Sequence, residues 1–144
     1  MIARLATAAR LLLAVSFLLN GVNWWWKLMP FPTLGDAPSP HNPAFVQAMI
    51  NTRFLFDGVK LVEVLAGAAL ATNLYVPLAL AVAFPVSVGV WAVDLGLLGS
   101  SLRAQVMGWS VMLLNSFLLL AYFENYALLF KMRSAPGRYW QAGR

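Results

Sequence analysis

Four long apolar stretches alternate with short polar segments along this chain. They cover about residues 5–26, 54–71, 76–98 and 105–130. An apolar helix of about 20 residues is long enough to cross the hydrocarbon core of a bilayer, because each residue adds about 1.5 Å. The pattern predicts an all-α, polytopic membrane protein with four transmembrane helices, in a single domain covering residues 1–144.

The longest polar segment, residues 27–53, has the composition of a loop. Proline and glycine are the strongest breakers of regular structure, and this segment contains Pro30, Pro32, Pro38, Pro40, Pro43 and Gly35. Its last part, residues 43–50, reads PAFVQAMI. That pattern predicts a short interfacial helix with proline in its first turn.

Composition supports a membrane protein and narrows its chemistry. The chain is 61% hydrophobic and 10% charged, with a mean hydropathy of +0.73, which is too apolar for a soluble domain of this size. It has no cysteine, which excludes disulfides and iron–sulfur clusters. The one histidine, His41, cannot form a bis-histidine haem site within one chain. We therefore predict no metal site and no intrinsic cofactor.

Basic residues predict the orientation in the membrane. Cytoplasmic segments of membrane proteins carry an excess of lysine and arginine. In this chain the basic residues concentrate near both ends, at Arg4, Arg10, Lys131, Arg133, Arg138 and Arg144. The pattern predicts a multi-pass protein of the cell inner (cytoplasmic) membrane, with both termini cytoplasmic and residues 27–53 periplasmic. The same distribution explains the net charge of +5 without nucleic-acid binding.

Charged residues inside the second apolar stretch mark the most informative position. Asp57, Lys60 and Glu63 are three residues apart, which places them on one face of a helix. A charge at the centre of a bilayer costs about 2.5–3.5 kcal/mol on insertion scales, so such residues usually face a polar interior. We predict an inward-facing, ligand-binding polar cluster in the outer half of the bundle, formed by Asn20, Asn23, Asp57, Lys60, Glu63, Trp91, Asp94 and Asn115.

The cluster has a functional and a structural interpretation. Three carboxylates and one ammonium would sum to −2, and burial disfavours this excess unless the cluster holds a proton, a cation or a hydrogen-bonding ligand. Alternatively, Asp57 and Lys60 form a simple ion pair near the interface, and Glu63 bonds to a backbone or hydroxyl group of a neighbouring helix. No Ser-His-Asp order, P-loop or dinucleotide fingerprint occurs, so the sequence supports neither a hydrolase nor a nucleotide-dependent enzyme and leaves open whether the protein is an enzyme.

Short motifs resemble those of the DoxX-like four-helix membrane proteins. The first helix contributes RLLL from Arg10 together with Phe17, Gly21 and Lys27. The run VEVLAG over residues 62–67, followed by PLAL over residues 77–80, resembles the central signature of that family. The resemblance implies a four-helix bundle in a cytoplasmic membrane and an association with quinone-linked redox systems. Related four-helix proteins also serve as chaperones or cargo receptors, so the family leaves function open.

Three functional hypotheses follow. The first is an accessory or ligand-binding subunit of a quinone-linked membrane system, in which the polar cluster holds the head group of a quinone or lipid. The second is a scaffold or assembly subunit of a larger complex, which contacts its partner through the Trp-rich first helix and the small residues 66–69. The third is a proton or small-solute transporter acting as an oligomer. Expected partners are membrane lipids and either further copies of the chain or a larger membrane complex.

Overall fold

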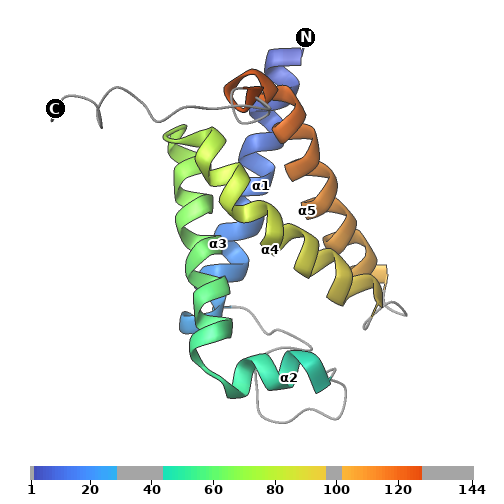
Figure 1. Cartoon of the computed structure of the whole chain (residues 1–144). Coiled ribbons are helices and arrows are strands. Elements are labelled where there is room, and N and C mark those ends of the chain that lie inside the picture. Colours follow the sequence, from blue (N-terminus) through green and yellow to red (C-terminus); the bar gives the residue numbers. More distant parts are fainter. Residues whose placement is uncertain (1, 29–43, 97–101, 128–144) are drawn as a thin grey trace, which may run out of the picture.

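The computed structural model describes residues 2–28, 44–96 and 102–127, and all regular elements in these ranges are helical (Figure 1). This confirms the all-α prediction. The elements are α1 (Ile2–Trp26), α2 (Ala44–Asn51), α3 (Phe54–Thr72), α4 (Val76–Gly96), α5 (Leu102–Ala121) and the 3-10 turn η1 (Phe123–Asn125). The short helix expected before the second apolar stretch is therefore present as α2. The last long helix ends at Ala121, before the predicted end at residue 130.

The four long helices pack as antiparallel neighbours. α1 packs along α3, α4 packs along α5, and further contacts join α3 to α4 and α1 to α5. Figure 1 shows α1 and α4 running in one direction and α3 and α5 in the other, with α2 lying across one end of the molecule. The core between them is made of apolar side chains, among them Leu13, Phe17, Ala66, Leu70, Leu80, Ala83, Val111 and Leu118.

The prediction of four membrane spans is wrong. Within the described residues, two helices are long and apolar enough to cross a bilayer: Ala3–Trp26 and Val76–Gly96, with hydropathies of 1.7 and 2.1. α3 is not a candidate span, because it carries three charged residues, Asp57, Lys60 and Glu63, within 19 residues. The apolar part of α5, Gln105–Ala121, is too short. The predicted cytoplasmic position of both termini was part of this four-span arrangement and is not retained.

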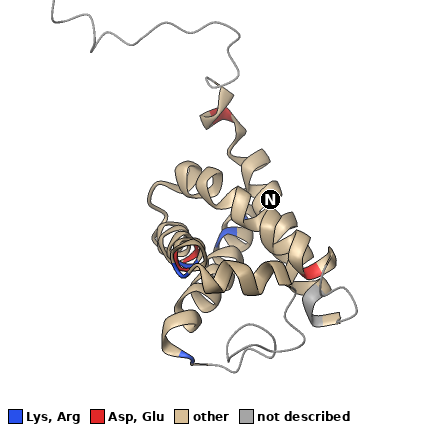
Figure 2. Cartoon of the chain, turned by 60° about the horizontal axis from the view of Figure 1, so that its bottom comes forward, with Lys and Arg blue, Asp and Glu red and all other residues tan. Residues whose placement is uncertain are grey.

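The exterior of the helices is apolar. Only 33% of the most apolar stretch of α1 and 28% of that of α4 is buried, whereas the core helix of a soluble protein would be mostly buried. Leu12, Leu65, Leu78 and Leu113, one from each long helix, are all more than half exposed. Charged positions are few over the described helices (Figure 2). An outer surface of this kind suits hydrocarbon better than water and points to a membrane location.

α1 and α3 approach each other closely at two glycines, one from each helix. A Cβ built on Gly21 of α1 would lie 2.7 Å from Val64 Cγ2 and 3.0 Å from the Lys60 carbonyl oxygen. A Cβ built on Gly67 of α3 would lie 2.8 Å from Leu18 Cγ and 3.1 Å from the Ala14 carbonyl oxygen. Small residues allow helix backbones to come this close. The two glycines therefore fix how α1 and α3 are aligned.

Arg10 is turned into the molecule and binds the end of α3. The sequence pattern treats it as a flanking charge that sets topology, but the side chain is buried and its guanidinium donates a hydrogen bond to the Leu70 carbonyl. α3 ends here, since Asn73 adopts the left-handed conformation and closes the last turn. A cation at this position complements the partial negative charge of the helix C-terminus.

Arg10→Met should lower the free energy of unfolding by about 1.5–3 kcal/mol, the usual value of a hydrogen bond to a charged group. The methionine keeps the apolar stem but loses the guanidinium. Thermal unfolding in a mild detergent measures the effect. Arg4→Met is the matched control, because Arg4 is exposed on the same helix. Equal stability of the two variants would show that the bond to Leu70 contributes nothing.

Candidate functional site

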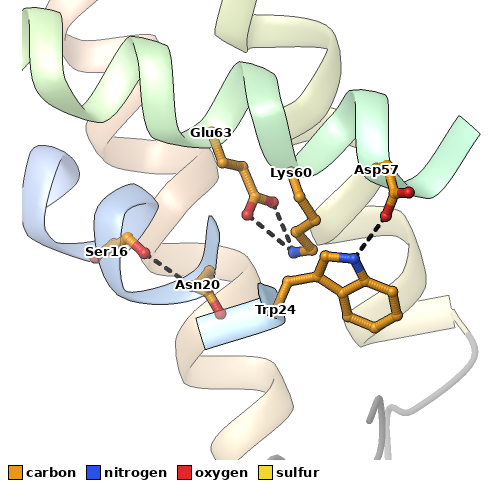
Figure 3. Close-up of polar contacts among 6 residues, drawn as sticks. All are labelled: Ser16, Asn20, Trp24, Asp57, Lys60 and Glu63. Carbon is orange, nitrogen blue, oxygen red and sulfur yellow. Dashed lines mark hydrogen bonds and ion pairs between the residues drawn. The ribbon is translucent and has the colours of Figure 1, made fainter. Parts of the chain in front are cut away.

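A buried ion pair lies at the centre of the site. Lys60 Nζ is 3.1 Å from Glu63 Oε1 and 2.9 Å from Glu63 Oε2, so both carboxylate oxygens accept from the one ammonium (Figure 3). The exposed fractions of the two side chains are 10% and 2%. Lys60 Nζ also lies 5.2 Å from the centre of the Phe56 ring, within range of a cation–π interaction. The i,i+3 spacing on α3 makes this pairing possible.

The third charge of α3 has a different partner. Asp57 Oδ1 accepts a 2.7 Å hydrogen bond from Trp24 Nε1 of α1, and in the described part of the chain it makes no ion pair with Lys60 (Figure 3). The Trp24 ring packs edge-on against Phe56 at 4.6 Å, and Lys27 Nζ lies 4.7 Å from its centre. The alternative in which Asp57 and Lys60 form the ion pair is therefore wrong. Trp24 therefore holds α3 to α1.

A second polar group joins α4 to α5. Ser87 Oγ donates to the Ala83 carbonyl at 3.2 Å, and Asn115 Nδ2 donates to Ser87 Oγ at 2.7 Å. Both Ser87 and Asn115 have 0% exposure. Two buried atoms, the acceptor Asn115 Oδ1 and the donor Trp91 Nε1, make no hydrogen bond with any described residue; we call them the open pair. Each such group costs about 1–3 kcal/mol, so native structures rarely leave one without a reason.

Asp94 lies beside this second group. It packs against Gly108 of α5, where an added Cβ would be 3.0 Å from Asp94 Cβ and 3.4 Å from Asp94 Oδ2. The charge of Lys60 acts on the Asp94 carboxyl electrostatically, although the two residues come from different helices. One turn away, the Trp91 ring meets Trp109 edge-on at 5.6 Å. The charged residues of α3 and the polar residues of α4 therefore belong to one region.

The antiparallel arrangement of α3 and α4 places Glu63 and Ser87 at the same level. The chain reverses around residues 73–75, and Leu70 and Leu80 stand five residues to either side of Tyr75. Glu63 lies seven residues before Leu70, and Ser87 lies seven residues after Leu80. At 1.5 Å per residue, Glu63 lies about 10 Å from Leu70 along α3, and Ser87 lies about 10 Å from Leu80 along α4. At this level α3 carries the buried Lys60–Glu63 pair and α4 shares the buried Ser87–Asn115 bond with α5; we call this level of the helices the buried layer.

All eight site residues predicted from sequence are buried or half-buried, but their roles differ. Asp57, Lys60, Glu63, Asp94, Trp91 and Asn115 take part in the contacts above. Asn20 donates to the Ser16 carbonyl of its own helix at 2.9 Å (Figure 3), and Asn23 is 1% exposed. His41 lies outside the described residues. Among the side chains that the structure describes, no three metal-binding groups come together.

Sequence reasoning missed Ser87, Trp24 and Arg10. Ser87 shares a face of α4 with Trp91 and Asp94 at four- and seven-residue spacing, which is the one signal that could have included it. Trp24 and Arg10 gave no such signal, because their partners lie on α3, at least 33 residues away in sequence.

Comparison with protein-family models, with curated proteins and with solved structures found no match to this chain. Membership of the DoxX-like proteins stays a prediction that depends only on the short sequence motifs.

Proposed function

We propose that this chain is a small multi-pass protein of the inner (cytoplasmic) membrane that binds the polar head of an amphiphile, a quinone or a lipid, between its helices. α1 and α4 are long and apolar enough to cross a bilayer, and α3 keeps its charges on the side packed against its neighbours. The observation that supports the proposal best is the buried layer that combines the Lys60–Glu63 ion pair with the open pair.

The distribution of polar and apolar groups fits this function. Ligand sites are mostly apolar, with a few placed polar groups that fix the orientation of the ligand. Here the polar groups face inward, while leucines such as Leu65 and Leu113 cover the outside. A long-chain ligand can therefore leave its tail among acyl chains and bring only its head group to the buried layer.

The role within a larger system follows from the resemblance to the DoxX-like proteins. We propose an accessory or ligand-binding subunit of a quinone-linked membrane system, working with lipids and with other copies of the chain or a larger complex. The scaffold alternative is supported less, because Gly67, within the small residues 66–69 that it would use, is already packed against α1. Trp25 and Trp26, both exposed, remain as a surface for a partner.

Purified protein in a mild detergent should carry about one quinone or lipid per chain, measured by extraction and mass spectrometry. Glu63→Gln should lower the bound amount about tenfold, because it breaks the ion pair that shapes the buried layer. Glu124→Gln is the matched control, since Glu124 is an exposed carboxylate of η1. The bound amount is compared only between samples with the same helical circular dichroism. No stoichiometric amphiphile in the unmodified protein, with Glu63→Gln indistinguishable from it, would reject the proposal.

A further inference from the structure

We infer that Ser87, Trp91 and Asn115 form a subsite for one neutral hydroxyl group, so that the protein binds hydroxyl-bearing amphiphiles, such as the reduced form of a quinone, in preference to carbonyl-bearing ones. This inference rests on the proposed ligand-binding function and specifies the chemistry of its head group.

The hydrogen bonds around Ser87 decide which end of the Asn115 amide is available. The Ser87 hydroxyl has one proton, and the Ala83 carbonyl accepts it. Ser87 Oγ can therefore only accept from Asn115, which identifies the amide nitrogen as the atom 2.7 Å away. The other end of the amide, Asn115 Oδ1, is then an acceptor. It is one member of the open pair.

The open pair can be satisfied by one ligand group that both donates and accepts a hydrogen bond. Asn115 Oδ1 needs a donor, and the indole N–H of Trp91 needs an acceptor. A hydroxyl group satisfies both, whereas a ketone, a quinone carbonyl or a methyl ether can satisfy only Trp91. An anionic head group would meet the carboxylates of Glu63 and Asp94 nearby, and an ammonium would leave Trp91 without an acceptor.

The two members of the open pair come from neighbouring helices, Trp91 from α4 and Asn115 from α5. Trp91 follows Ser87 by four residues, so the two lie on one face of α4 about 6 Å apart along its axis. Asn115 is fixed at the level of Ser87 by their hydrogen bond.

The neighbouring ion pair leaves this hydroxyl protonated. Both oxygens of Glu63 already accept from Lys60, and the group that faces the hydroxyl is the amide of Asn115, which is no base. The subsite therefore binds and orients the hydroxyl group without removing its proton.

The test compares three probes on the purified full-length protein in detergent: a decyl hydroquinone kept reduced, its quinone, and its dimethyl ether. Bound probe is measured by mass spectrometry after gel filtration over a concentration series. The hydroquinone should bind about tenfold more tightly than either of the others, the gain of one buried hydrogen bond. Equal affinity for the three probes would overturn the inference, and this comparison requires no variant.

Three variants then assign the two hydrogen bonds. Asn115→Leu should lower hydroquinone affinity to that of the quinone and leave quinone affinity within about twofold, because only a hydroxyl donates to Asn115. Trp91→Phe should weaken hydroquinone and quinone alike. Trp26→Phe is the matched control, because Trp26 is 69% exposed at the end of α1, and it should change neither affinity. A uniform loss for all probes in Asn115→Leu would contradict the assignment.

A further arm uses dioleoylglycerol, whose hydroxyl lies on a lipid rather than an aromatic head. Binding that depends on Asn115 supports the subsite and identifies a lipid as the source of the hydroxyl. If none of the probes binds while the protein still carries a co-purified amphiphile, the hydroxyl subsite is wrong and the proposed function stands. If no amphiphile of any kind is bound, both are wrong.

Discussion

Lys60→Met should lower the free energy of unfolding by about 3–5 kcal/mol, because it leaves the Glu63 carboxylate buried without its counter-charge. The carboxylate has both oxygens on Lys60 and only 2% of the side chain exposed, so water cannot replace the lost ammonium. Glu63→Leu should cost a similar amount for the opposite reason, since it leaves the ammonium buried.

The double variant Lys60→Met/Glu63→Leu should recover most of this loss. Replacing a whole buried ion pair by apolar side chains of similar volume is often neutral or stabilising, because the desolvation of both charges is also removed. Reversible unfolding in mixed micelles, measured for the unmodified protein, the two single variants and the double variant, gives the coupling energy between the residues. A double variant as unstable as the sum of the single ones would show that the two charges do not stabilise each other.

Alanine at Gly21 or Gly67 should destabilise the protein by about 1–3 kcal/mol each, the usual cost of overpacking. The new methyl group would meet a carbonyl oxygen of the facing helix at 3.0 Å for Gly21 and 3.1 Å for Gly67, besides a side chain closer than 3 Å. A backbone carbonyl cannot rotate away as a side chain can. The two helices must separate to admit the methyl group, and the contacts around it are lost.

The same substitution should have the opposite sign at Gly58 and Gly89. A Cβ built on either of them meets nothing within 4 Å, so alanine should stabilise by about 0.5–1 kcal/mol through helix propensity. All four variants can be compared by thermal unfolding in one detergent. If all four shift stability in the same direction, the close contact between α1 and α3 has no energetic consequence.

The helices could be predicted from sequence because their signals are local. Long apolar runs separated by proline, glycine and asparagine indicate the four long helices. The predicted starts of α3 and α4, at Phe54 and Val76, agree with the structure. The number of membrane spans was less secure, because it depends on how many charges a span tolerates, and α3 exceeds that number. The topology was predicted partly from Arg10, whose position in the sequence cannot reveal that its guanidinium is used inside the molecule.

The candidate site could be predicted in part for the same reason. The i,i+3 spacing of Lys60 and Glu63 was enough to predict that they lie on one inward-facing side of a helix. The bond from Trp24 to Asp57 and the bond from Asn115 to Ser87 depend instead on how separate helices are aligned. That alignment is set by packing at positions such as Gly21 and Gly108, and no spacing along a single helix encodes it.

The fit of Gly21 and Gly67 has a consequence for biosynthesis. The ribosome completes α1 before any of α3 has been made, so α1 is without its best-fitting neighbour during this interval. During this interval the guanidinium of Arg10 has no helix end to bind. A nascent chain stalled before Phe54 would therefore leave both Gly21 and Arg10 without the partners that α3 provides.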